Sequence, residues 1–210
     1  MRLIGISAVV ALLVLIGLVT TLGRLAGAAQ EGVVVKDDFA KDNPRWKFVT
    51  GRWVRRVADG RPVLAQTVET QPWAVALLED KTFGDVDVSV RFRPISGKED
   101  ASGGIILRAR DGQNYLLVRA NALENNFRLY TLVNGSRRTI ASARVTEPKL
   151  GEWHTLRVTA SGPRIRAWLD GAALIDHTDT TYSRGFIGLW TKADSVTEFA
   201  DLTATGTVSP

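Results

Sequence analysis

Short segments rich in β-branched and aromatic residues, separated by turn residues, follow one another along most of this chain. The clearest group lies near the middle, where Ile105–Arg110, Tyr115–Ala120 and Phe127–Val133 have the composition of three consecutive strands. Asp111-Gly112 is a typical two-residue turn between the first two, and residues 121–126 form a longer connection between the next two. This succession predicts a meander of sheet strands.

The side chains of this meander alternate in character. Ile105 and Leu107 alternate with Ile106 and Arg108, and successive side chains of a strand point to opposite faces of the sheet. One face is therefore expected to be apolar. The other is expected to carry arginine and tyrosine side chains, namely Arg108, Arg110, Tyr115, Arg119, Arg128 and Tyr130. Such a surface is either a solvated sheet face or the floor of a binding groove, and the pattern leaves both readings open.

Similar segments occur on both sides of the meander. Further strands are predicted at Val33–Phe39, Trp53–Val57, Val63–Thr67, Trp73–Leu78, Val86–Phe92, Arg138–Ala143, Trp153–Ala160, Arg164–Leu169, Ala172–Asp176, Phe186–Lys192 and Thr197–Thr205. Val86, Val88, Val90 and Phe92 alternate with polar residues in the clearest period of two in the chain. Turns are predicted at Asp59-Gly60, Asn134-Gly135 and Asp170-Gly171. No segment has the apolar spacing of a helix over a helical length. The pattern predicts an all-β domain over residues 30–205, folded as a two-sheet antiparallel sandwich or jelly roll, with a tail at 206–210.

The N-terminal segment is typical of export. An uncharged apolar run, Leu3–Leu22, follows Arg2, and small residues follow it at Ala26–Ala28. These features predict a signal peptide over residues 1–29, cut after Ala28 or Ala29. The alternative is an uncleaved membrane anchor, since the run approaches the ~20 residues that span a bilayer. Both readings place the domain outside the cytoplasm, in the periplasm or secreted, with membrane contact only through this segment.

Charge and cysteine content narrow the function classes. Without residues 1–29 the chain has 25 basic and 22 acidic residues, interspersed rather than clustered, so no nucleic-acid partner is indicated. The chain has no cysteine, which excludes a disulfide framework and a lipoprotein anchor. His154 and His177 have no ligand-type residues at metal spacing, so a zinc site is not expected.

Several segments together resemble a known family. FGDVDVSVRFRP, SGGIILRARDGQNYLLVRANALENNFRLY, GEWHTLRV, the LDG turn and GFIGLWTKADSVTEFADL are similar, in this order, to the concanavalin A-like, laminin-G-like jelly-roll domains of bacterial exported proteins. These include the 3-keto-disaccharide hydrolase domain and domains named glycoside hydrolase family 16-like. The resemblance spans about Asp37 to Leu202 and implies two packed antiparallel sheets with ligands on a concave face.

The resemblance and the residue types together suggest a saccharide ligand. The predicted ligand-binding residues are Arg108, Tyr115, Arg119, Asn121, Glu124, Arg128, Tyr130, Trp190 and Lys192. Arginine forks onto hydroxyl or carboxylate oxygens, and aromatic rings stack on sugar faces. Trp190 is expected to have open space beside it because Gly188 has no side chain, whereas Trp73 is assigned to core packing.

Catalysis, metal binding and recognition of a protein or anionic polymer in the cell envelope are the alternatives. Glycoside hydrolysis needs two carboxyl groups about 5 to 10 Å apart, and the E-x-D-x-E arrangement of family 16 hydrolases is absent. Glu124 is the remaining catalytic candidate, for a glycoside hydrolase of the 3-keto-disaccharide type. No cofactor is required by the pattern. A structural calcium ion could be held by Asp37, Asp38 and Asp201 if the first and last strands pair.

Overall fold

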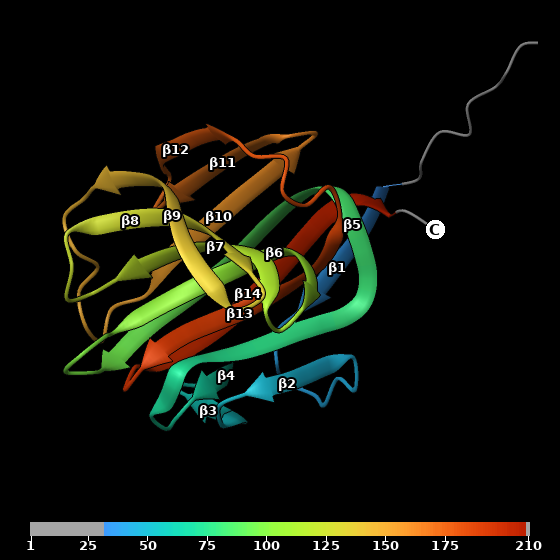
Figure 1. The fold of residues 1–210 in the computed structure, drawn as a ribbon. Helices are drawn as coiled ribbons and strands as arrows, with labels where there is room; N and C mark the ends of the chain where they lie inside the picture. Colours follow the sequence, from blue (N-terminus) through green and yellow to red (C-terminus); the bar gives the residue numbers. More distant parts are fainter. Residues whose placement is uncertain (1–31, 209–210) are drawn as a thin grey trace, which may run out of the picture.

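The computed structural model describes residues 32–208, and every regular element in this range is a β-strand (Figure 1). The strands are β1 (Gly32–Asp37), β2 (Trp46–Thr50), β3 (Trp53–Ala58), β4 (Arg61–Gln66), β5 (Thr70–Ser96), β6 (Ser102–Asp111), β7 (Asn114–Asn121), β8 (Asn126–Val133), β9 (Ser136–Arg144), β10 (His154–Ser161), β11 (Arg164–Leu169), β12 (Ala172–Thr178), β13 (Gly185–Ala193) and β14 (Val196–Val208). Their pairings are antiparallel throughout.

The long strand β5 belongs to two layers. Its first half pairs with β2 and β13, and its second half pairs with β10 and β14. The first sheet therefore has the order β2-β5-β13-β6-β7-β8-β9, and the second has β12-β11-β10-β5-β14, with β1 and β4 on β14 and β3 on β4. This arrangement is the predicted jelly-roll sandwich.

The strict alternation of the second half of β5 builds the core between the sheets. Val86, Val88, Val90 and Phe92 are at most 4% exposed, as the period of two predicts. Burying a side chain of this size contributes roughly 1.5 to 3 kcal/mol. Gly103 of β6 leaves room for the Phe92 ring, since a Cβ at this glycine would lie 2.5 Å from Phe92 Cδ2.

Three predicted turns have the expected backbone. Asp59-Gly60, Asn134-Gly135 and Asp170-Gly171 each have positive φ at both residues and connect neighbouring antiparallel strands. Two successive residues with positive φ characterise the type I′ turn, whose twist matches that of the strands it joins. The hairpin predicted at Asn134-Gly135 is therefore confirmed.

The alternation in β6 breaks at Arg108, which has a φ of 50° and lies in an irregularity of the β6–β7 pairing. Before this residue Leu107 faces the core between the sheets, whereas Ala109 belongs to a second buried cluster. That cluster lies on the outer face of the first sheet and contains Val75, Leu77, Ile106, Ala109, Tyr115, Leu117, Tyr130, Leu132 and Trp190. The expectation of a polar outer face is thus wrong for its centre.

Three other features of the chain differ from the sequence-based strands. The pattern misses β2, and it predicts two separate strands where β5 runs through without interruption. β14 continues to Val208, past Gly206, where the sequence predicts a tail. The predicted signal or anchor segment lies outside the described residues. Within residues 32–208 there is no helix that could cross a bilayer.

Candidate saccharide site on the first sheet

The outer face of the first sheet, which points away from the second sheet, is concave. Four strands separate β5 from β9, so a flat sheet with a spacing of about 4.8 Å would place them roughly 24 Å apart. The guanidinium carbon of Arg137 on β9 nevertheless lies 5.4 Å from the ring centroid of Trp73 on β5. The sheet must curl to allow this contact, and Figure 1 shows β9 lying across the front of the sheet.

Strand pairing places polar side chains across this concave face. Gly104 of β6 pairs with Arg119 of β7, and Arg119 pairs with Arg128 of β8. Lys192 of β13 pairs with Trp73 of β5. Because directly opposite residues of antiparallel strands point to the same side, these pairs form two neighbouring rows of polar and aromatic groups.

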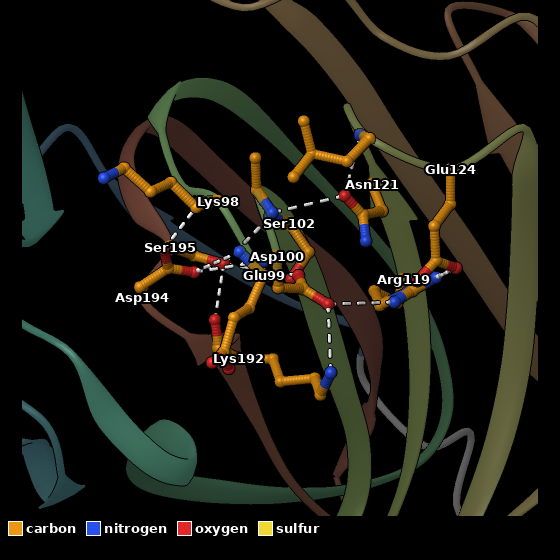
Figure 2. Close-up of polar contacts among 12 residues, drawn as sticks. Lys98, Glu99, Asp100, Ser102, Arg119, Asn121, Glu124, Lys192, Asp194 and Ser195 are labelled. Atoms are coloured by element: carbon orange, nitrogen blue, oxygen red, sulfur yellow. Dashed lines mark hydrogen bonds and ion pairs between the residues drawn. The ribbon is translucent and has the colours of Figure 1, made fainter.

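One end of the concave face has a buried carboxylate between two cations (Figure 2). Asp100, in the connection after β5, is fully buried, and its Oδ2 lies 3.3 Å from Arg119 Nη1 and 3.5 Å from Lys192 Nζ. Its Oδ1 accepts a hydrogen bond of 3.3 Å from Ser195 Oγ. A buried charge without partners would cost several kcal/mol, so Asp100 and its cations hold one another in place.

Asp194 fixes the backbone that carries Asp100. Its carboxylate accepts hydrogen bonds from the backbone N–H groups of Lys98 at 2.6 Å, Glu99 at 3.1 Å and Asp100 at 3.1 Å. These bonds, that of Lys98 first, lower the pKa of Asp194. The tip between β13 and β14 therefore positions the 98–100 segment from the other side of the site.

Glu124 is held as an anion at the rim. Its Oε2 accepts hydrogen bonds of 2.7 Å from Arg119 Nη2 and from Asn126 Nδ2, and Arg128 Nη1 lies 3.9 Å away. Partial burial acts to raise the pKa of Glu124, but the bonds from Arg119 and Asn126 and the neighbouring charges outweigh it and lower the pKa to about 2. Glu124 is consequently suited to accept hydrogen bonds and unsuited to deliver a proton near neutral pH.

Aromatic rings line the other part of the concave face. The ring centroids of Trp73 and Trp190 are 6.2 Å apart, and the guanidinium carbon of Arg137 lies 5.7 Å from Trp190 and 4.7 Å from Tyr130. Trp190 is 0% exposed and Tyr130 is 3% exposed, whereas Trp73 is half-buried. Of these three rings, Trp73 is the one that a ligand can reach.

A cleft of about 390 Å³ opens beside Trp73. It is lined by Val49, Thr50, Pro72, Trp73, Asp111, Gly112, Gln113 and Gly135. The β6–β7 turn closes one side of it by approaching β2, since a Cβ at Gly112 would lie 2.6 Å from Val49 Cγ1. An indole wall in such a cleft suits the flat apolar face of a sugar ring.

Eight of the nine predicted ligand-binding residues lie on the concave face or at its rim, namely Tyr115, Arg119, Asn121, Glu124, Arg128, Tyr130, Trp190 and Lys192. They differ in access. The side chains of Lys192, Glu124 and Arg128 are 31%, 36% and 37% exposed. Tyr115 is fully buried, and Asn121 accepts hydrogen bonds from two backbone N–H groups with Oδ1, so both support the site from below.

Arg108, the ninth residue, does not lie on this face. Its side chain is buried, and Nη1 donates to the carbonyl of Tyr182 at 3.0 Å, while Nη2 donates to those of Gly84 at 3.2 Å and Gly162 at 2.5 Å. Burial lowers the pKa of Arg108. The expected position of Arg108 in the groove is wrong because the bulge at this residue turns its side chain toward three loops.

The expected open space beside Trp190 is also wrong. A Cβ at Gly188 would lie 2.3 Å from the carbonyl oxygen of Ala76 and 3.0 Å from Leu77 Cδ2, so β5 fills the space that the glycine leaves. Trp190 is completely buried. A sugar cannot stack on Trp190 in this arrangement, and the stacking position moves to Trp73.

Sequence reasoning missed three residues of the site. No sequence pattern singles out Asp100 or Arg137, and Trp73 is assigned to core packing. Only the curl of the first sheet brings Arg137 to Trp73, and only the 98–100 segment brings Asp100 to Lys192. The one available signal concerns Trp73, which directly follows Pro72 and a run of polar residues. Such a position marks the end of a strand rather than its centre.

The predicted calcium ligands do not meet in one site. Asp37 uses its carboxylate to accept three hydrogen bonds, one of them 2.8 Å from Trp46 Nε1. Asp38 caps its own turn, and Asp201 forms an ion pair with Arg61. In the part of the chain that the structure describes, no three His, Cys, Asp or Glu residues are grouped as a metal site.

The strand order, the curled first sheet and its polar rim define a jelly-roll domain of the concanavalin A-like class. The chain belongs to the family of the 3-keto-alpha-glucoside-1,2-lyase-like domain, whose model matches residues 36–204. This confirms the resemblance seen in the sequence. No curated protein sequence matches the chain.

Solved structures share this fold at low sequence identity. The carbohydrate-binding module CBM66 from Bacillus subtilis is 20% identical, with a TM-score of 0.64 over 76% of this chain and 94% of that one. A Bacillus licheniformis beta-glucanase is 11% identical, with a TM-score of 0.58 over 83% and 98%. The VIP36 exoplasmic/lumenal domain, in its Ca²⁺/Man3GlcNAc-bound form, is 13% identical, with a TM-score of 0.57 over 80% and 86%.

Proposed function

We propose that this chain is an exported carbohydrate-binding domain that recognises a saccharide at the concave face of the first sheet. The observation that carries the proposal is half-buried Trp73, which lines a cleft and pairs with Lys192 of the neighbouring strand. An aromatic wall next to fixed polar groups is the usual composition of a saccharide site. The similarity of the fold to CBM66 and to the Man3GlcNAc-bound VIP36 domain supports it.

The polar rim is prepared for hydroxyl groups before a ligand arrives. Arg119 is fixed by Asp100 and Glu124, and Glu124 is fixed in turn by Asn126. Groups held in this way lose little side-chain entropy on binding, which otherwise costs about 0.5 to 1.5 kcal/mol for each flexible side chain. Glu124 and Lys192 retain solvent exposure and can turn acceptor and donor atoms toward the sugar.

Hydrolysis or elimination on a 3-keto-glycoside is the second candidate function, and the family match favours it. Asp100 and Glu124 bind the two ends of one guanidinium, that of Arg119, so two carboxylates do flank the site. Glycoside hydrolysis, however, needs one carboxyl group with a raised pKa as the proton donor. The pKa of Glu124 is lowered and Asp100 is buried between cations, so we favour binding without turnover.

A glycan array combined with a 3-keto-glucoside turnover assay on the purified protein tests the proposal. We expect saturable binding without turnover, lost in Trp73→Ala and weakened in Lys192→Met. Trp168→Ala is the matched control, because Trp168 is a half-buried tryptophan of the second sheet that stacks under Arg157. Turnover abolished by Glu124→Gln would establish the enzyme instead, and binding unaffected by Trp73→Ala would remove the concave face from consideration.

The compartment and the metal requirement belong to the same proposal. We infer export through residues 1–29, followed by a periplasmic or secreted location, which N-terminal sequencing of the expressed protein in its host would test. Structural calcium at Asp37, Asp38 and Asp201 remains a prediction of the sequence. Because these carboxylates already have other partners, we expect EDTA to leave saccharide affinity and melting temperature unchanged, and a fall of several degrees would contradict this.

A further inference from the structure

The concave face has more cationic than anionic groups. Its cations are Arg119, Arg128, Arg137 and Lys192, and its carboxylates are Asp100 and Glu124. Both carboxylates are engaged by Arg119, Lys192 or Arg128 within 4 Å. Asp111, at the edge of the cleft, accepts hydrogen bonds from Gln113 and Asn114. With Asp111 counted, the face has four cations and three carboxylates, so one positive charge is in excess.

Arg137 is the cation without a carboxylate. Within residues 32–208 its side chain has no ion pair and donates no hydrogen bond, and its Nη1 is buried without a partner. Its guanidinium carbon lies 4.7 Å from the ring of Tyr130, 5.4 Å from Trp73 and 5.7 Å from Trp190. Stacking on aromatic rings offsets part of the charge through cation–π attraction, but it leaves the in-plane N–H donors unused.

Arg137 lies next to the Trp73 cleft, although it is not one of the residues that line it. Of its three guanidinium nitrogens only Nη1 is buried without a partner, so Nε and Nη2 retain contact with solvent. Trp73 lines the cleft and also stacks on Arg137. Gly135, two residues before Arg137, lines the same cleft. A sugar ring lying on Trp73 would thus place an exocyclic group beside the guanidinium.

We propose that the cleft selects an acidic saccharide, with the carboxylate of a uronic acid residue forked onto Arg137. This rests on the proposed function and specifies its ligand class. A planar two-oxygen anion matches the guanidinium fork in two parallel hydrogen bonds, while the three aromatic rings keep the arginine oriented. A sulfate ester offers similar oxygens on a tetrahedral centre, so it is compared directly in the experiment.

The test uses matched ligands that differ at the carboxylate alone. Oligosaccharides of galacturonate, glucuronate and mannuronate are each titrated beside their carboxyl-reduced forms and beside a sulfated neutral oligosaccharide, by calorimetry at fixed ionic strength. We expect at least one uronate to bind about 10- to 100-fold more tightly than its reduced form. Arg137→Met should abolish this preference, so that the acid and its reduced form bind with equal affinity.

Arg138→Met is the matched control, since Arg138 is the exposed neighbour of Arg137 on the same strand, and it should keep the preference. Arg137→Lys, which keeps the charge but loses the fork, should recover only a small part of the preference. Equal affinity for acid and reduced forms, a stronger response to sulfate, or a preference that survives Arg137→Met would overturn the inference. In each case, the proposed function would still be supported if the protein binds neutral glycans and Trp73→Ala abolishes that binding. If the protein binds no neutral glycan either, the proposed function fails as well.

Discussion

At the scale of single residues, the structure divides the arginines of the meander into two kinds. Arg119 and Arg128 belong to the concave face and contact carboxylates there, whereas Arg108 donates only to backbone carbonyls. Sequence alternation treats them alike because it assumes an unbroken strand. The bulge at Arg108 breaks that assumption and gives this residue a structural role.

We therefore predict that Arg108→Met destabilises the fold and leaves saccharide specificity unchanged. The substitution leaves the carbonyls of Gly84, Gly162 and Tyr182 without their charged donor, at a cost of about 3 kcal/mol or more. Urea unfolding measures this loss. The control is Arg110→Met, which removes a guanidinium stacked on Tyr182 and should cost under about 1 kcal/mol. Equal losses in both variants would show that the three carbonyl contacts carry little stability.

Glu124 permits a prediction about pH. The pKa of Glu124 is lowered from 4.5 to about 2 in the folded protein, so ionised Glu124 stabilises the fold above pH 4.5 and loses this contribution as pH falls toward 2. Wild type should thus exceed Glu124→Gln in unfolding free energy at pH 7, by under about 1 kcal/mol because Glu124 is partly exposed. The two should converge near pH 2. A difference that grows on acidification would contradict the ion pair with Arg119.

At the scale of elements, the site depends on how connections between strands are held. The 98–100 segment contributes Asp100, yet it has no regular structure of its own and is positioned by Asp194 between β13 and β14. Lys192 and Ser195 come from the same tip as Asp194. One end of the site is therefore an assembly of two connections that are distant in sequence.

We expect Asp194→Ala to loosen this assembly without unfolding the sheets. Three backbone N–H groups lose their shared acceptor, so amide exchange at Lys98, Glu99 and Asp100 should accelerate by more than tenfold, while amides of β7 keep their protection. Hydrogen exchange with mass spectrometry resolves the two regions. Glu99→Gln is the control, since Glu99 contributes only its backbone N–H to these contacts. Unchanged exchange at 98–100 would show that Asp194 does not hold the segment.

At the scale of the whole molecule, the sequence predicts the class of fold and most strands but not the depth of the site. Alternation along Val86–Phe92 and turn pairs such as Asn134-Gly135 are local signals, and both predictions are confirmed. The curl of the first sheet arises from contacts across several strands. For this reason the sequence misses Arg137 and misjudges how far the aromatic rings are buried. It does assign Arg119, Glu124 and Lys192 to one surface, where the structure links them through Asp100 and Arg119, and their role in ligand binding stays a prediction.

The shared strand β5 has a consequence for the stability of the molecule. Because its first half lies in the first sheet and its second half in the second, neither sheet can lose β5 without disturbing the other. Phe83 lies where β5 passes between the layers, is 2% exposed, and pairs with both β13 and β14.

We predict that Phe83→Ala costs about 3 to 5 kcal/mol and lowers the exchange protection of β8 and β11 by the same free energy. Val57→Ala, at a 70% exposed position of β3, should cost under about 0.5 kcal/mol. If protection fell in β8 alone or in β11 alone, the two sheets would be separate cooperative units, and the continuity of β5 would not couple them.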